Sequence, residues 1–481
     1  MECRNVVIVD ACRTAVGKMG GACKPLSALD MACATIRGNL DRSGIDPAEI
    51  DEVILGQCRQ TSDEPNIARV AALRSGIPES CPAYTVMRQC ASGMTAVQNA
   101  RDAALETLLQ TSRGGWSDGS LKRTVQRAGL DSRDAALCSR LVYGVVQNRA
   151  LLDYYIDHWC TQRANHLEPV VAYVLRLGVY QILFMDKIPE RAAVNEAVEQ
   201  IKRWGRPRAA GMVNAVLRKC VASKNALPPL RGKDDAALLS LQYSHPRWLV
   251  ERLIKLLGRG ETEQLLALHN QPVPTVIQTN PLKTTPAALR QELEVAGAEV
   301  TPHPWLEGCF TVTGTGDLEK LPAFTEGRCT VQDAAARLVS LAAAPDQHAR
   351  VLDVCAAPGG KSFALAMDMA DGGDILSCDV HPHKIKLIES GAQRLGLRSI
   401  RTALADGREP HAAWLGQADL VVADVPCSGL GIIRKKPDIR YKNPSELSQL
   451  PPIQKAILDN VCRYVRPGGV LVYATCTILP E

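Results

Sequence analysis

The segment that most constrains the fold is residues 350–361, RVLDVCAAPGGK, an apolar run that ends in a proline and two glycines. The run has the length and composition of a buried strand, and helical periodicity begins at residue 362. Glycines between a strand and a helix let a ligand approach the backbone, where the first N–H groups of the helix have no partner. The segment therefore predicts the first strand–turn–helix unit of a doubly wound α/β sheet.

Acidic residues close the next two strand-like runs. The run 374–380 carries Asp379 next to its end, about 20 residues past the glycines, and Asp406 follows the run 399–405. The carboxyl ends of parallel strands converge on the crevice where such sheets bind ligands, and an acid at this spacing suits ribose hydroxyls. Taken alone, this pattern fits any nucleotide-binding sheet.

Two cysteines follow two further apolar runs. Cys427 lies in Asp-Val-Pro-Cys-Ser-Gly after the run 418–425, and Cys476 lies in Tyr-Ala-Thr-Cys-Thr after the run 470–475. Both positions are the carboxyl ends of predicted strands, so both thiols are expected on the rim that carries the glycine turn. A thiolate on that rim can act as a nucleophile and a good leaving group, whereas a single cysteine out of context is more often a structural thiol.

The string CAAPGGK, together with the Pro-Cys and Thr-Cys pair, resembles the RNA cytosine-C5 methyltransferases of the Nol/Nop/Sun group. DNA cytosine methyltransferases attack with the Pro-Cys cysteine and lack the Thr-Cys partner, so the pair favours RNA. The resemblance implies Cys476 as the nucleophile that adds to C6 of cytosine and Cys427 as the residue that assists product release. It implies S-adenosyl-L-methionine as the cofactor, bound by Cys355, Ala356, Ala357, Pro358, Gly359, Gly360, Lys361, Asp379 at the ribose, Asp406 beside the adenine and Asp424 bordering the target base.

Residues 101–228 read as a series of amphipathic helices with few strand signals. The segments YQILFMDKIPERAAVNEAVEQIKRWG and MVNAVLRK resemble the NusB-like RNA-binding domain. A cluster of basic residues in this region suits a phosphate backbone, although a solvated helix face is the alternative. The basic residues are Lys187, Arg191, Lys202, Arg203, Arg206, Arg208, Arg218 and Lys219.

Residues 229–345 combine strand and helix signals, and SHPRW and TNPLKT resemble the RRM-like segment that precedes the catalytic domain in ribosomal RNA cytosine methyltransferases. With 346–481 as a Rossmann-like methyltransferase domain, this order is similar to bacterial 16S ribosomal RNA methyltransferases of the RsmB (Sun/Fmu) type. The resemblance implies a cytosine in 16S ribosomal RNA as substrate. The basic loop GIIRKKPDIRY adds Arg434, Lys435, Lys436 and Arg440 as expected phosphate contacts.

Residues 1–100 predict a separate α/β unit. The strings VVIVDACRTAVGKMGG and QCASGMTAVQNA resemble the start of a biosynthetic thiolase, in which the cysteine matching Cys90 carries the acyl group. The thiolase histidine and second cysteine have no counterpart downstream, so Cys90 is expected to be a nucleophile without its base. The predicted fold is therefore multidomain: a thiolase-like α/β fragment, an all-α NusB-like domain, a small α+β region and a Rossmann-like domain.

Composition narrows the remaining function classes. The net charge is +5, a mild basic bias, and no apolar run approaches the length of a membrane span, so a cytoplasmic protein without a membrane partner is expected. The 17 cysteines include no Cys-x-x-Cys pair, which argues against a zinc site. Their odd number also argues against a secreted disulfide framework.

The resembled family continues past the Thr-Cys motif, whereas this sequence stops at Glu481, so we expect a sheet without its last strands. The thiolase-like fragment in front suggests two joined gene pieces, with the junction near residues 98–104. Weak or absent methyl transfer is the expectation for this chain. The alternative functions are a thiolase-type acyl transfer through Cys90 and a non-catalytic RNA-binding protein built on the helical domain.

Overall fold

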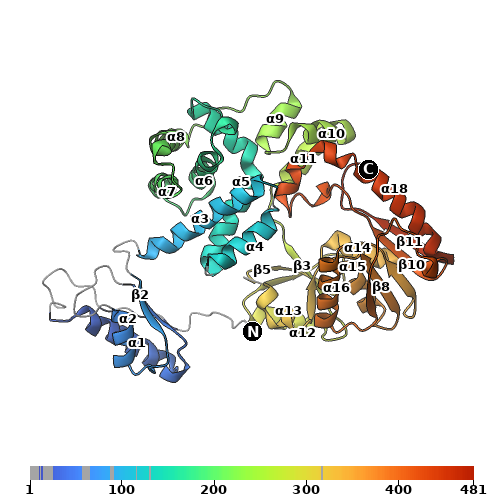
Figure 1. Cartoon of the computed structure of the whole chain (residues 1–481), viewed down its shortest axis with the longest axis horizontal. Helices are drawn as coiled ribbons and strands as arrows, with labels where there is room; N and C mark the ends of the chain where they lie inside the picture. The colour runs from blue at the N-terminus through green and yellow to red at the C-terminus, as the bar shows by residue number, and fades with distance from the viewer. Residues whose placement is uncertain are drawn as a thin grey trace.

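The computed structural model describes residues 25–56, 66–86, 92–114, 116–128, 132–315 and 318–480, together with residues 10, 12, 14 and 130. The chain forms separate bodies: the N-terminal elements lie apart at the lower left of Figure 1, a helical body lies above, and two sheet-containing bodies lie to the right. In the part of the chain so described, we find no helix both long enough and apolar enough to cross a membrane.

The N-terminal body pairs two short strands with two helices. Its elements are α1 (Ala28–Ser43), β1 (Val53–Gly56), α2 (Ile67–Arg74) and β2 (Ala83–Val86), and the two strands are parallel. Ser27 begins α1 with a capping box in which Asp30 accepts from the Ser27 backbone N–H. The expected α/β character is confirmed here, while the strand expected at 6–9 and Cys90 lie outside the described residues.

The helical body confirms the all-α prediction. It contains α3 (Ser92–Ser112), α4 (Ser117–Arg127), α5 (Ser132–Trp159), α6 (Pro169–Phe184), α7 (Glu190–Arg203) and α8 (Ala210–Ser223). The apolar helix α6 lies at its centre, with most of its residues buried. Two helices expected at 133–146 and 151–159 are one helix, α5, because the intervening Gln-Asn-Arg-Ala contains no glycine or proline to end it.

A third body follows the helices α9 (Asp235–Gln242), α10 (Arg247–Leu257) and α11 (Arg259–His269). Its antiparallel sheet has the order β4-β5-β3-β6. Apolar residues of α12 (Pro286–Val295) cover the sheet, and the expected α+β region is confirmed. The strands are β3 (Thr275–Thr279), β4 (Glu299–Pro302), β5 (Cys309–Thr313) and β6 (Cys329–Val331).

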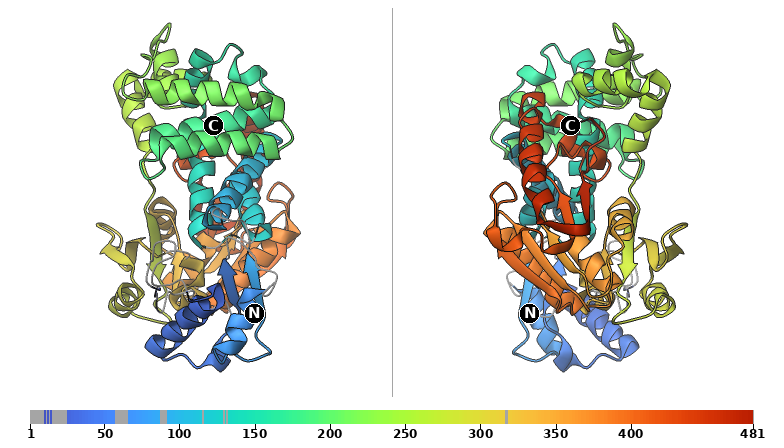
Figure 2. Two further views of the ribbon diagram at one scale, coloured as in Figure 1. Left: turned by 90° about the vertical axis from the view of Figure 1, so that its left-hand side faces the viewer. Right: turned by 90° about the vertical axis from the view of Figure 1, so that its right-hand side faces the viewer.

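The C-terminal body is a parallel sheet of order β11-β10-β7-β8-β9, which confirms the doubly wound prediction. Helices α14 (Ala334–Ala343), α15 (Gly360–Asp368), α16 (Pro382–Leu395) and α18 (Leu450–Val461) belong to this body, and Figure 2 shows the sheet from two sides. The chain builds outward from β7 to β9 and then returns to β10 beside β7. That reversal opens a crevice at the carboxyl ends of the strands. The strands are β7 (Arg350–Asp353), β8 (Asp374–Asp379), β9 (Ile400–Leu404), β10 (Ala418–Asp424) and β11 (Val465–Ala474).

Arg440 joins the helical body to the C-terminal body, and its expected role as a phosphate contact is wrong. It lies in η8 (Pro437–Tyr441) and is fully buried. Its Nη1 donates to the backbone oxygens of Gln147 in α5 (3.1 Å) and Ser244 (3.0 Å), and burial lowers its pKa to about 10. Arg440 cannot contact an RNA phosphate, because its guanidinium is closed off from solvent and donates to backbone carbonyls inside the protein.

Candidate active site

The glycine turn between β7 and α15 has the geometry that its sequence predicts. Gly359 has φ +108°, and a Cβ at this position would lie 2.3 Å from the Phe363 ring, so only glycine fits. Gly360 begins α15, so the first free N–H groups of this helix lie at the carboxyl end of β7. Ala356 and Gly359 are buried beneath the turn, and Pro358 is exposed.

A cavity of 460 Å³ lies beside this turn, along the carboxyl ends of β7, β8, β9 and β10. Apolar side chains, among them Val380, Ile453 and Ile457, form part of its wall. The cavity brings together seven of the predicted site residues: Cys355, Ala357, Asp379, Asp406, Asp424, Cys427 and Cys476.

The acids of this cavity are held by local partners. Asp379 is 5% exposed and accepts from the His381 N–H (3.1 Å), with the Lys384 ammonium 3.5 Å away. Asp406 accepts from Arg408, and this hydrogen bond lowers the pKa of the Asp406 carboxyl. Both side chains are therefore fixed as acceptors at successive strand ends.

A second cavity, of 480 Å³, lies at the carboxyl ends of β10 and β11. Its lining includes Lys361, Arg434 and Lys435, with Asp424 and Cys476. Asp424 and Cys476 line both cavities, so the two spaces meet at this carboxylate and this thiol. One cavity can hold a cofactor while the other receives a substrate group.

The two predicted cysteines lie in contact at that meeting point. The Sγ atoms of Cys427 and Cys476 are 3.2 Å apart, and the Cys476 N–H points to the Cys427 sulfur, also at 3.2 Å. The Cys476 segment is fixed by Gly431, whose N–H donates to the Cys476 carbonyl (2.8 Å) and whose Cβ, if present, would collide with it. Neither thiol is part of a disulfide, and Cys476 is exposed.

The surroundings of Cys476 shift its pKa in opposing directions. The hydrogen bond with Cys427 raises the pKa of Cys476, partial desolvation of its sulfur and the charge of Asp424 raise it further, and Lys361 opposes them. Lys361 lies 2.5 Å from Asp424 and so places a positive charge near the Cys476 thiol, which lines the same cavity. Burial raises the pKa of the Cys355 thiol, which lines the first cavity, to about 12.

Several of the basic side chains predicted to contact RNA already pair with acidic or backbone groups of the protein. Lys435 pairs with Asp333 (2.6 Å), Lys436 with Asp118 (3.6 Å), and Arg434 donates to the backbone oxygen of Gln271 (3.2 Å). All eight basic residues predicted on the helical body are exposed, and three of them pair with acids: Lys202 with Glu199, Arg203 with Asp102 and Arg206 with Glu168. Their role in RNA binding stays a prediction.

Sequence reasoning missed Lys442. Its Nζ donates to the carbonyl of Ser428 (2.7 Å), the residue that follows Cys427. Lys442 directly follows the loop GIIRKKPDIRY, in which four basic residues are predicted as phosphate contacts, and this position is the signal that was missed. Lys442 therefore braces the segment that carries the Cys427 thiol.

Fold and site together define a Rossmann-like methyltransferase domain attached to an all-helical domain and a small antiparallel sheet. Residues 340–481 match the family described as 16S rRNA methyltransferase RsmB/F. The chain is 35% identical over 382 residues to the probable ribosomal RNA small subunit methyltransferase B of Bacillus subtilis (strain 168), covering 79% of this chain and 85% of that protein. The chain belongs to the 16S rRNA methyltransferase RsmB/F family.

Further matches follow the domain order. Residues 98–222 match the NusB family and residues 245–319 the ferredoxin-like domain of RsmF/B-like methyltransferases. The Vibrio cholerae ribosomal RNA small subunit methyltransferase B is 33% identical, covering 80% of this chain and 87% of that protein. The crystal structure of PH0851 superposes with a TM-score of 0.68 at 25% identity, over 79% of this chain and 86% of that chain.

The N-terminal resemblance is also found. Residues 6–106 match the thiolase N-terminal domain, and this match overlaps the NusB match within α3. Helix α3 runs unbroken from Ser92 to Ser112 through the overlap, so the expected boundary at residue 100 falls inside one helix.

Proposed function

We propose that this protein transfers a methyl group from S-adenosyl-L-methionine to C5 of a cytosine in 16S ribosomal RNA through a covalent Cys476–C6 adduct. The observation that carries this proposal is the 3.2 Å contact between the Cys427 and Cys476 sulfurs, at a thiol that lines both cavities. The kind of RNA substrate is inferred from the family, since its members are described as 16S rRNA methyltransferases.

The first cavity fits S-adenosyl-L-methionine in size and charge. Its 460 Å³ lies within the range of small-molecule sites. Asp379 can accept from ribose hydroxyls, and Val380 and Ile457 offer apolar contact to an adenine. Its basic side chains, Lys384 and Arg408, are already engaged by Asp379 and Asp406, which suits a nucleoside without phosphates better than a nucleotide. When bound, the cofactor supplies an electrophilic methyl group on a positively charged sulfur.

Cys476 provides the electron pair for the reaction. Its thiolate forms a bond to C6 of the cytosine, and the C5=C6 π pair moves to C5. C5 would then take the methyl group as the methyl–sulfur bond of the bound cofactor breaks, and the electron pair of that bond would stay on the sulfur. A base next removes the C5 proton. The electrons of that C–H bond restore C5=C6 while the bond from C6 to Cys476 breaks and the thiolate leaves.

The neighbours of Cys476 have distinct roles. Cys427, in contact with the departing sulfur, can return a proton to it and so favour product release. The Asp424 carboxylate borders both cavities and can accept from the exocyclic amino group of the cytosine, with Lys361 holding it in place. The target base has to leave its stack to enter the second cavity.

Trapping with 5-fluorocytosine-containing 16S RNA and S-adenosyl-L-methionine tests this chemistry in a single turnover, so slow catalysis is sufficient. Fluorine at C5 prevents the proton loss, so we expect a covalent protein–RNA band with the wild-type protein. Cys476→Ser should abolish the band, and Cys462→Ser, at an exposed cysteine outside the site, should leave it unchanged.

The same experiment with unmodified RNA distinguishes the roles of the two thiols. Cys427→Ser should let the adduct accumulate with ordinary cytosine, because release is slowed. An adduct that survives Cys476→Ser would reverse the two cysteine roles. RNA binding without any adduct would favour the non-catalytic RNA-binding alternative.

A further inference from the structure

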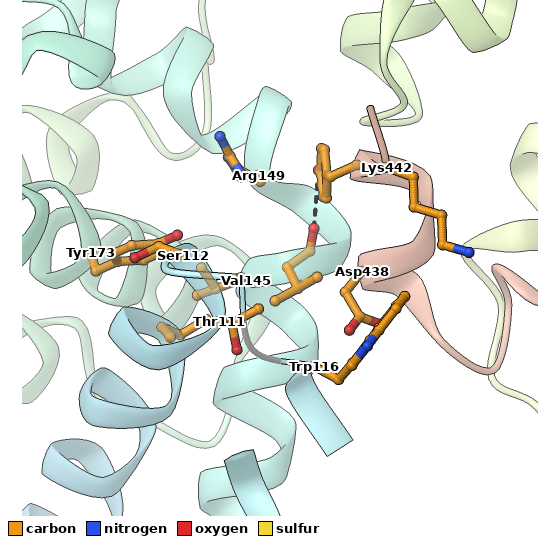
Figure 3. Close-up of a pocket in the computed structure, with 12 residues that line it drawn as sticks. Thr111, Ser112, Trp116, Val145, Arg149, Tyr173, Asp438 and Lys442 are labelled. Carbon is orange, nitrogen blue, oxygen red and sulfur yellow. Dashed lines mark hydrogen bonds between the residues drawn. The ribbon is translucent and has the colours of Figure 1, made fainter. Parts of the chain in front are cut away.

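A cavity of 290 Å³ lies where the helical body meets the segment that follows the active-site loop, lined by α3, α5, α6 and η8. The geometry points to a binding site for an unstacked nucleotide of the RNA substrate, with its base against Trp116 and its two flanking phosphates near Arg149 and Lys442. This inference rests on the proposed function, because it places a second part of the same RNA. Figure 3 shows Arg149 and Lys442 on different sides of the labelled group, with Trp116 beside Asp438.

Aromatic and apolar side chains form the walls of this cavity. Trp116 is 54% exposed, an unusual position for a large aromatic side chain, and Tyr173 and Tyr441 also line the space. Leu108 and Val145 close its inner side. Sequence-specific RNA recognition targets unstacked bases, which stack on exposed aromatic rings of this kind.

Two cations at the cavity have no acidic partner among the described residues. The Arg149 guanidinium lies 4.9 Å from the centre of the Tyr441 ring, and the Lys442 ammonium lies 5.4 Å from the centre of the Trp116 ring. The cavity's carboxylate, Asp438, uses Oδ2 to accept from the Ser117 N–H (3.0 Å) at the start of α4. Positive charge next to exposed aromatic rings suits a phosphate and its base.

The cavity is directly connected to the reaction centre. Lys442 lines the cavity and donates to the Ser428 carbonyl, one residue from the Cys427 thiol. Domain boundaries are common places for ligand sites, and this one joins the NusB-like body to the catalytic body. A nucleotide bound here would fix the RNA strand relative to the cytosine at Cys476 and hold the two bodies together.

Binding of a 16S RNA transcript to the full chain, measured without cofactor across a salt series, tests the inference. Trp116→Ala and Arg149→Met should each weaken binding by about tenfold, as expected for loss of one stacked base or one phosphate contact. Arg149→Met should also reduce the slope of log affinity against log salt by about one charge. Zero-length ultraviolet cross-linking should place RNA on peptides containing Trp116 or Tyr441.

Two matched variants serve as controls. Trp305→Ala removes another exposed tryptophan, 63% exposed, and Arg252→Met removes another arginine stacked on an aromatic ring, 5.7 Å from Trp248. Both should bind RNA as the wild type does. Wild-type affinity in Trp116→Ala and Arg149→Met would overturn the inference, whatever the trapping experiment gives. A loss in these variants without any Cys476 adduct would keep the nucleotide site and reject the proposed chemistry.

Discussion

The sulfur atoms of Cys427 and Cys476 lie 3.2 Å apart, although the two residues are separated by 49 positions in the sequence. The contact arises because β10 and β11 are adjacent parallel strands, with Asp424 opposite Ala474, and each cysteine follows its strand end by two or three residues. The loops that follow neighbouring parallel strands lie at the same edge of the sheet. The thiol pair is thus a consequence of strand order.

The first prediction concerns the ionisation of Cys476. Its hydrogen bond with Cys427 is the largest cause that raises its pKa, so Cys427→Ala should lower that pKa. The thiolate is the reactive form, so alkylation of Cys476 by iodoacetamide should be slow at neutral pH and rise with pH, with the rise displaced to lower pH in the variant. Mass spectrometry of the Cys476 peptide measures the rate, and the exposed Cys462 is the internal control. An unchanged pH profile would contradict this account.

The second prediction concerns Asp353, which is fully buried at the end of β7. Burial raises the pKa of this carboxyl from 3.8 to about 7, against the opposing hydrogen bond from Ser362. Because the folded protein holds the proton more tightly than the unfolded chain, this contribution to stability is complete below pH 4 and is lost as the pH rises through 7.

Asp353→Asn should abolish this loss of folding stability with rising pH. Relative to wild type, the variant should gain stability as the pH rises from 5 to 8, by up to about 2.6 kcal/mol. Urea unfolding at each pH gives the difference. Asp371→Asn is the control, since the pKa of Asp371 is lowered rather than raised, so this variant should show no gain over the same range. A constant difference between Asp353→Asn and wild type would show that the carboxyl stays charged.

The third prediction concerns the close approach of α5 and α6. A Cβ at Gly144 would lie 1.9 Å from the Tyr180 ring, and both residues are buried. Gly144→Ala should destabilise the protein by roughly 1–3 kcal/mol, since the ring has to move out of a packed interior. Gly211→Ala in α8 is the matched control, because nothing lies within 4 Å of its new Cβ. The midpoint of thermal unfolding should be lower for Gly144→Ala than for Gly211→Ala. Equal midpoints for the two variants would contradict the close packing of α5 and α6.

The fourth prediction concerns Arg440. Arg440→Met should leave the carbonyls of Gln147 and Ser244 without their donor, at a cost on the order of 3 kcal/mol. Because these carbonyls belong to the helical body and its connection, limited proteolysis should also show the two bodies separating more readily. Arg466→Met removes an exposed arginine paired with Asp419 and should cost at most about 1 kcal/mol. Equal effects would mean that Arg440 does not join the bodies.

The sequence by itself determined the local elements and the motifs. The period of apolar residues predicts α6, β8 and β10 closely, and the residues of the glycine turn restrict what can follow β7. Motif strings also predicted the domain order, because they lie in short continuous segments. Hydrogen bonds of helices and turns connect nearby residues, so this information is local.

Only the tertiary structure decided which distant side chains meet. The sequence predicts Arg440 as an RNA contact because it shares a basic loop with Lys435 and Lys436, and the packing of α5 against η8 buries it instead. Trp116, Arg149 and Lys442 come from segments far apart in the chain, so no pattern in the sequence marks their shared cavity. Burial and charge pairing depend on how whole elements pack, and that packing is a property of the assembled fold.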